Sequence, residues 1–413
     1  MFEAYYECRR NKRNTANALK YELDYESNLV KLWKDINLRR YKIGRSICFI
    51  VTRPKLREVF AADFRDRIVH HIIMRRLEPL FERHFINATY SCRKGKGTLY
   101  GVKDLVAQIA EKSDSGTSRC FVGKFDMKGF FMTIHKPTLL RMLLDFVDAR
   151  YDGEDKETLK YLIRKVVSNR PQDNCIRQSP PSMWDELPKN KSLFTCGDEY
   201  GLPIGNLTSQ CFANFYLDGF DKHVLGKFGY YGRYVDDFFV LADSSKDISG
   251  YIGEMGRYLA EKLQVILHPD KVYIQDARNG VKFVGGVVKP NRLYISNRTV
   301  SNAYKAVNRM NTLVEKDNAE KMMQSLNSYF GFMKHYRSYK IKKRILKLIG
   351  EEWWKYIMYD EKRGVIHSIF PGSNMRRRGN PAGRSTSSWR FSALTANHCS
   401  WNRISVRPRN ATA

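Results

Sequence analysis

The 413-residue sequence has no uninterrupted apolar run near the roughly 20 residues that a membrane-spanning helix needs. Its first residues are polar and aromatic, not charged and then apolar, so they lack the pattern of a secretion signal. None of its eight cysteines forms a C-x-x-C pair, and none clusters with histidine at the spacing of a zinc site. We therefore expect a cytoplasmic protein with reduced cysteines, no structural zinc and no membrane partner.

Acidic residues are scarce relative to basic ones: 43 Asp and Glu stand against 72 Lys and Arg, which gives a formal net charge of +29. This charge argues against an ordinary enzyme of small anionic metabolites and favours a polyanionic partner, first of all nucleic acid. Because 43% of the residues are hydrophobic and 13% are aromatic, the chain is not a disordered basic tail. It can form a large core beneath a positive surface.

Three aspartates stand at the ends of segments that have the composition of buried strands. Asp126 follows an apolar run, and Asp236 and Asp237 lie between the strand-like runs 233–235 and 238–241. Adjacent carboxylates repel each other, and burying them is costly unless cations neutralise them. An Asp-Asp pair is common in surface turns, but here two apolar strands fix the turn against the core. If the fold brings the third aspartate beside the pair, the site suits two Mg²⁺ ions, with Mn²⁺ as an alternative.

Three ordered motifs resemble those of reverse transcriptases. Residues 234–237, Tyr-Val-Asp-Asp, resemble the Y-x-D-D signature, and the strand that ends at Asp126, with the double phenylalanine after it, resembles the first catalytic block. Residues 201–210 and 213–217 resemble the block between the two. The resemblance covers roughly residues 45–345. It implies an α+β fold of the right-hand polymerase type, with fingers, a palm built on an antiparallel sheet, and a helical thumb.

The resemblance divides the chain into consecutive regions. These are N-terminal helices and fingers (1–115), a first part of the palm (116–150), a fingers insertion (151–200), a second part of the palm (201–295), a thumb (296–360) and a basic tail (361–413). The insertion holds several Pro, Asp and Asn residues, so we expect it to be irregular. The tail has ten Lys and Arg against one acid and no periodicity, so we expect it to be disordered.

The middle motif narrows the resemblance. Most bacterial reverse transcriptases have Gln where this chain has Ile204, and Pro where it has Gln210. The form Ile-Gly-x-x-x-Ser-Gln is similar to that of diversity-generating retroelements, whose enzymes copy a template-repeat RNA with errors at adenines before the cDNA moves into a variable gene. The thumb segment 325–335 is also similar. The resemblance implies a bacterial or phage-encoded enzyme of mutagenic retrohoming that works with an oligomeric basic accessory protein.

The resemblance also implies roles for matching residues, position by position. The metal ligands would be Asp126, the backbone carbonyl of Met127, Asp236 and Asp237. The residues at the incoming dNTP would be Lys55, Arg57, Phe131, Ile204, Gln210 and Lys271. Those at template RNA, or at the primer of an RNA–cDNA duplex, would be Arg93, Lys96, Gly97, Ser209, Gly285 and Gly286. Phe131 would exclude a 2′-hydroxyl and Lys271 would lie near the leaving pyrophosphate, whereas a solvated charge explains Lys55 equally well.

Two alternatives stay open on the sequence alone. One is another reverse transcriptase, from a group II intron, a retron or a phage-defence system. A group II intron protein should add a DNA-binding or endonuclease extension, and the chain has no H-N-H cluster or cysteine pair. The other is a non-catalytic RNA-binding protein that keeps only the polymerase fold, although three intact aspartates argue against it. No integrase or RNase H pattern follows the thumb, so integration and template removal would need host factors.

Overall fold

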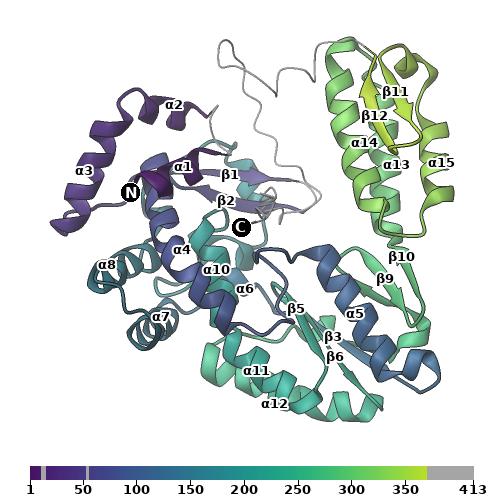
Figure 1. Cartoon of the computed structure of the whole chain (residues 1–413), viewed down its shortest axis with the longest axis horizontal. Helices are drawn as coiled ribbons and strands as arrows, with labels where there is room; N and C mark the ends of the chain where they lie inside the picture. The colour runs from purple at the N-terminus through teal and green to yellow at the C-terminus, as the bar shows by residue number, and fades with distance from the viewer. Residues whose placement is uncertain (11–14, 53–54, 370–413) are drawn as a thin grey trace, which may run out of the picture.

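The centre of the molecule is a four-stranded antiparallel sheet, which we call the palm sheet (Figure 1). The computed structural model describes residues 1–10, 15–52 and 55–369 of the chain. The palm strands are β3 (Phe121–Phe125), β5 (Tyr231–Tyr234), β6 (Asp237–Ala242) and β7 (Tyr273–Asp276). Their order is β5-β6-β3-β7, so the strands that precede and follow the predicted catalytic aspartates are direct neighbours.

Helices cover both faces of the palm sheet. They are α5 (Thr98–Lys112), α11 (Asp218–Phe228) and α12 (Ser245–Leu263). In β6, Phe238 and Val240 point into the core beneath α11 and α12. Phe239 and Leu241 point into the opposite core beneath α5, as the two-residue period of a strand requires. Because both faces are buried, the strands are fixed and their ends have a defined place.

The fingers lie beside the palm and contain the N-terminal helices (Figure 1). Their elements are α1 (Phe2–Arg10), α2 (Ala16–Glu22), α3 (Tyr25–Asn37), β1 (Ser46–Val51), β2 (Arg57–Ala61), α4 (Phe64–His84) and β4 (Cys175–Arg177). Strand β1 pairs antiparallel with β2 and parallel with β4. The side chain of Asp63 caps α4 by accepting a hydrogen bond from the Arg65 N–H. Helix α4 packs against α1 and α2, and also against the helix of residues 207–216. It thus joins the N-terminal helices to the segment that precedes β5.

The region 151–200 is more regular than the sequence predicts. Two α-helices lie within it, α8 (Lys156–Val167) and α9 (Ser182–Asp185), whereas α6 (Phe130–Thr133) and α7 (Lys136–Arg150) precede it and α10 (Leu207–Tyr216) follows it. Helix α8 buries four apolar residues and packs against α7 and α4. The expectation of an irregular insertion is therefore wrong for its first third, because the Pro and Asn residues that suggested it follow α8.

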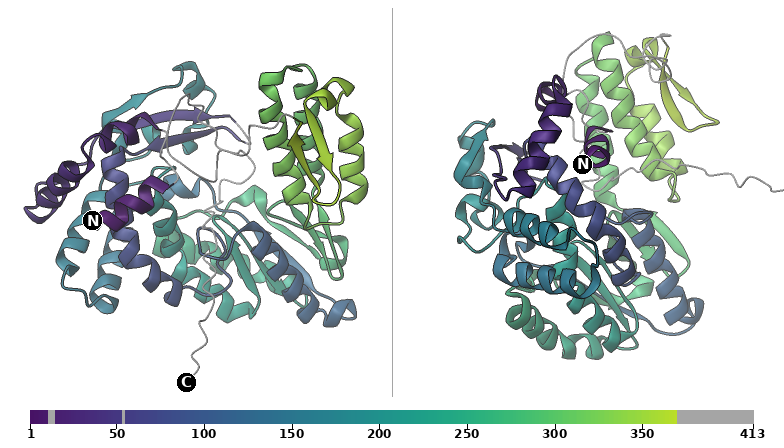
Figure 2. Two further views of the ribbon diagram at one scale, coloured as in Figure 1. Left: turned by 45° about the horizontal axis from the view of Figure 1, so that its top comes forward. Right: turned by 60° about the vertical axis from the view of Figure 1, so that its left-hand side comes forward.

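The thumb has a core of its own. Its elements are α13 (Asn297–Asn311), α14 (Ala319–Met333), α15 (Tyr339–Leu348), β11 (Ile357–Asp360) and β12 (Val365–Ser368). A small sheet of β8 (Val281–Phe283), β9 (Gly286–Lys289) and β10 (Arg292–Ile295) leads from the palm to the thumb. The β11–β12 hairpin packs on α14 (Figure 2), where the Asn327 amide bonds to both backbone groups of Ile366.

This hairpin changes the predicted end of the thumb. The division expected between residues 360 and 361 falls inside it, because β12 pairs with β11 from Asp360↔Val365 to Ile357↔Ser368. Residues 361–369 are therefore ordered parts of the thumb and not of a disordered tail. The rest of the predicted tail, 370–413, lies outside the described residues. Over the ranges that the structure describes, no helix combines the length and apolar content that a bilayer crossing requires.

Candidate active site

The three predicted aspartates lie at the same end of the two central strands of the palm sheet, β3 and β6. Phe125 lies opposite Phe238, so Asp126, just past the end of β3, is level with Asp237, the first residue of β6. Asp236 precedes it in the turn between β5 and β6. Burial, then the negative charges of Asp237 and Asp126, raise the pKa of Asp236 to about 6. Carboxylates that repel one another in this way are stabilised by a cation bound between them.

Two lysines form ion pairs with Asp126 and Asp237. Lys271 Nζ lies 2.8 Å from Asp126 Oδ1, and Lys124 Nζ lies 3.1 Å from Asp237 Oδ1. Within the described part of the chain, no three His, Cys, Asp or Glu side chains are gathered closely enough to hold a metal ion. The donor chemistry nevertheless fits Mg²⁺, which prefers carboxylate and carbonyl oxygen. Partly exposed ion pairs contribute only about 0–1 kcal/mol, so an incoming ion can displace both lysines.

The backbone oxygen of Met127 is directed toward the same end of β3 and β6. Met127 forms an antiparallel bridge with Leu267. The hydrogen bonds across this bridge come from neighbouring residues, with the Asp126 carbonyl accepting from the His268 N–H at 2.8 Å. At such a pair the central residue's own carbonyl points away from its partner strand, here toward β6. The geometry thus supports the Met127 carbonyl as a further oxygen ligand.

Cations from the fingers and thumb surround the carboxylates. Arg57 begins β2, and its positive charge lowers the pKa of Asp236, against the larger effects that raise it. The pKa of Lys55 is lowered first by partial burial and then by nearby positive charges. These charges belong to Arg298, Lys271 and Arg57. A cluster of cations that repel one another beside carboxylates suits a polyphosphate bound with metal ions. Arg298, in the first turn of α13, was not predicted.

Phe131 and Ile204 pack on one small core between the fingers and the middle motif. The Phe131 carbonyl accepts a hydrogen bond from the Leu202 N–H at 2.8 Å, and the Ile204 carbonyl accepts one from the Phe60 N–H at 2.8 Å. Gly205 follows with a φ of +118°, and a Cβ there would lie 2.7 Å from the Phe60 carbonyl oxygen. This close approach explains the glycine and ties the middle motif to β2.

Ser209 and Gln210 lie in the first turn of α10. Ser209 is buried, whereas Gln210 is half-buried and its Oε1 accepts a hydrogen bond from Cys92 Sγ at 3.2 Å. Cys92 belongs to the loop between α4 and α5, which we call the template loop (residues 87–97). The middle motif is therefore in direct contact with the loop that carries Arg93, Lys96 and Gly97.

Within the template loop, the three predicted residues differ in their surroundings. Arg93 is only 7% exposed, and its guanidinium pairs with Glu82 at 2.9 Å and donates to the Ile86 carbonyl at 2.6 Å. Its side chain therefore supports the loop and does not face a template, contrary to the predicted contact. Lys96 donates to the Asn87 carbonyl at 2.5 Å, and burial lowers its pKa to about 8. Gly97 caps α5 with a φ of +137°, a conformation that favours glycine.

Gly285 and Gly286 lie at the turn between β8 and β9. The Gly285 carbonyl accepts a hydrogen bond from the Ser296 N–H at 3.0 Å, and a Cβ on Gly285 would lie 3.0 Å from the Phe332 ring. A Cβ on Gly286 would lie 3.2 Å from the Tyr336 ring. These contacts place the turn at the junction of palm and thumb.

Sequence comparison identifies the family. Residues 53–288, more than half of the chain, match the family described as reverse transcriptase (RNA-dependent DNA polymerase). The chain belongs to this reverse transcriptase family. Its mixed helix and sheet architecture is that of a right-hand polymerase, with the palm sheet, the fingers and the thumb arranged as described above. The family match includes the three aspartates and the middle motif.

Individual relatives of this reverse transcriptase are distant. Protein YkfC of Escherichia coli (strain K12) is 22% identical over 278 residues, which cover 59% of this chain and 65% of YkfC. The match thus spans less than two thirds of that relative. Among solved structures, truncated apo telomerase from Candida tropicalis aligns with a TM-score of 0.44 at 12% identity, over 62% of this chain and 55% of the telomerase. Telomerase from Candida albicans in complex with a telomeric RNA fragment aligns with a TM-score of 0.42 at 13% identity, over 82% and 65%.

Proposed function

We propose that this protein is an RNA-directed DNA polymerase that copies RNA into cDNA at Asp126, Asp236 and Asp237. The observation that carries the proposal is the junction of β3 and β6, which sets Asp126 level with Asp237 and beside Asp236, among cations from the fingers and the thumb. A non-catalytic RNA-binding protein would have no use for mutually repelling, half-buried carboxylates, which cost folding free energy.

In the proposed reaction the three aspartates and the Met127 carbonyl would hold two divalent ions, Mg²⁺ or Mn²⁺. When bound, such ions activate a primer 3′-hydroxyl and stabilise the charge that develops on the phosphate. Lys55 and Arg57 orient the triphosphate from the fingers side. Lys271 Nζ, released from Asp126, is positioned to donate a proton to the leaving pyrophosphate. Phe131 would lie under the sugar of the incoming nucleotide and exclude ribonucleotides.

Primer extension by the purified full chain tests this proposal. With an RNA template, Mg²⁺ and the four dNTPs we expect a product that DNase degrades and RNase does not, and far less product with NTPs. The absence of any extension on RNA, with Mg²⁺ or Mn²⁺, would contradict the proposal.

We further propose that the RNA is a template repeat, and that the enzyme serves mutagenic retrohoming in a bacterial or phage system, in the cytoplasm, with an oligomeric basic accessory protein. Ile204 supports this finer assignment. Its side chain lies in the small core beside Phe131 and cannot donate or accept hydrogen bonds at the nascent base pair. A glutamine there could form such bonds and so reject mispairs.

Replacing Ile204 with glutamine is therefore expected to lower misincorporation opposite template adenine by about 3- to 10-fold, since one hydrogen bond contributes about 0.5–1.5 kcal/mol. Errors opposite the other template bases should change less. Sequencing of cDNA made by the two proteins on one template measures both. Val166→Gln, a change from an aliphatic residue to glutamine on α8, serves as the control. An unchanged adenine error rate in I204Q would contradict this account of fidelity.

A further inference from the structure

The catalytic turn contains an unfavourable backbone conformation. Tyr234 pairs with Asp237, so Val235 and Asp236 are the two central residues of a tight hairpin turn. Val235 has a φ of +60°, in the left-handed region that a β-branched residue avoids. Glycine is the usual residue at the first central position of such a turn. Something in the surrounding structure must therefore hold Val235 in place.

The side chain of Arg233 contacts this turn. Arg233 is fully buried in β5, two residues before Val235. Its Nη1 donates a hydrogen bond to the Val235 carbonyl oxygen at 2.9 Å. This bond joins the guanidinium to the peptide unit that connects Val235 with Asp236, so a shift of one shifts the other. Backbone strain and an anchoring hydrogen bond thus occur at the same point.

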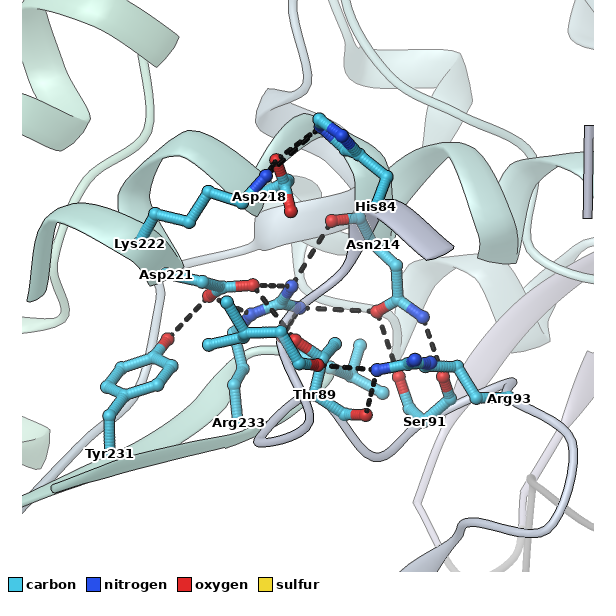
Figure 3. A network of polar contacts seen from close by, with 12 residues as sticks. His84, Thr89, Ser91, Arg93, Asn214, Asp218, Asp221, Lys222, Tyr231 and Arg233 are labelled. Atoms are coloured by element: carbon cyan, nitrogen blue, oxygen red, sulfur yellow. Dashed lines mark hydrogen bonds and ion pairs between the residues drawn. The ribbon is translucent and has the colours of Figure 1, made fainter. Parts of the chain in front are cut away.

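The guanidinium is itself held on every side (Figure 3). Nε and Nη2 form a two-pronged ion pair with Asp221, each at 2.6 Å. The Asn214 side-chain and backbone oxygens accept from Nη1 and Nη2, each at 3.2 Å. With Val235, these contacts use all five N–H donors of arginine. Asp221 is similarly saturated, because Tyr231 and Thr89 donate their hydroxyls to it at 2.6 and 3.2 Å.

The same network reaches the template loop. The Arg233 N–H donates to the Ala88 carbonyl at 2.8 Å, and the Arg233 carbonyl accepts from the Tyr90 N–H at 2.9 Å. Asn214 Nδ2 donates to the Ser91 carbonyl at 2.6 Å. Arg233 thus connects the turn that carries Asp236 with the loop that lies beside Gln210: its side chain contacts the turn, and its backbone and its partner Asn214 contact the loop.

We propose that Arg233 is a positioning residue for the reaction, which holds the strained Val235–Asp236 turn in its catalytic conformation and couples it to the template loop. This inference deepens the proposed function and rests on it. Lysine cannot replace the arginine, because a single ammonium cannot bond to Asp221, Asn214 and Val235 in one plane. Glycine at position 235, in contrast, adopts a positive φ without strain and removes the need for the anchor.

A double-mutant cycle tests the proposal. R233K should lower kcat for dNTP addition by about 10- to 100-fold with little change in KM, because a small displacement of reacting groups has effects of this size. In the V235G background the same substitution should lower kcat by about threefold or less. Assays are run below the melting temperature of every variant. D221N is the second variant, because it weakens the ion pair of the same guanidinium but keeps Arg233. Its loss of kcat should likewise be smaller in the V235G background. An equal loss of kcat in both backgrounds would overturn the proposal.

A measurement that needs no activity separates this inference from the proposed function. Amide hydrogen exchange over residues 231–242 should become at least about tenfold faster in R233K, with α12 unchanged. Equal protection of the turn in both proteins would overturn the role of Arg233, even if the wild-type chain makes cDNA. Faster exchange in a chain that makes no cDNA would support the anchoring and reject the polymerase function.

Discussion

Replacing Asp236 with asparagine is expected to lower the rate of cDNA synthesis by about 10³-fold or more, while the protein stays folded. Burial raises the pKa of Asp236, and the negative charges of Asp237 and Asp126 raise it further. Asparagine has nearly the same shape but carries no charge and is a weaker oxygen ligand for Mg²⁺. The substitution therefore removes a charged metal ligand without leaving a cavity.

The stability of this variant makes the result interpretable. Because one of three mutually repelling charges is removed, D236N should melt at the same temperature as the wild type or a higher one. D145N, an equivalent change at an exposed aspartate of α7, should alter neither rate nor melting temperature. Single-turnover extension and thermal melts on the three proteins supply the comparison. A D236N protein that keeps more than a tenth of the wild-type rate would show that the chemistry lies elsewhere.

Replacing Asp221 with alanine should lower the free energy of unfolding by about 3–5 kcal/mol. The side chains of Asp221 and Arg233 are 1% and 0% exposed, so alanine leaves a buried guanidinium without its counter-ion. It also leaves the hydroxyls of Tyr231 and Thr89 without their acceptor. A loss of this size is a large part of the 5–15 kcal/mol that holds a typical domain together.

Urea denaturation of paired variants measures this effect. D145A, at the exposed site on α7, is the matched control and should stay within about 0.5 kcal/mol of the wild type. The double variant D221L/R233M removes both charges and fills the space, so it should be more stable than D221A. A D221A protein within about 1 kcal/mol of the wild type would show that the buried pair adds little to the fold.

The carboxylate group could be predicted from the sequence because its signal is local. Strands of apolar residues end at Asp126 and begin again at Asp237, and neighbouring strands bring such ends together. The cations around the carboxylates could not all be predicted in this way. Lys124 occupies a half-exposed position within β3, and Arg298 lies 174 residues further along at the start of α13, so only the folded chain shows that they face the site. A charged residue in the sequence does not show which part of the folded protein its side chain faces.

Buried polar partners were the main source of error. Arg93 sits in a loop rich in Gly and Lys, which favoured a template contact, but Glu82, in the last turn of α4, pairs with its guanidinium in the interior. Arg233 was given no role beyond the first position of the strand-like run 233–235, although a charged residue inside an apolar strand is itself a signal of a buried network. The β11–β12 hairpin was missed because the charge of the tail hid a strand–turn–strand pattern around Gly364.

The most direct test of the central claim is whether the three aspartates act as one centre. Single-turnover dNTP addition on an RNA template is measured for the wild type, D126N, D237N and the double variant D126N/D237N. If the aspartates share the same metal ions, each single change removes the centre, and the double variant keeps the same residual rate as either single one. Losses that multiply in the double variant, or near wild-type rates in either single variant, would contradict a shared catalytic centre at the junction of β3 and β6.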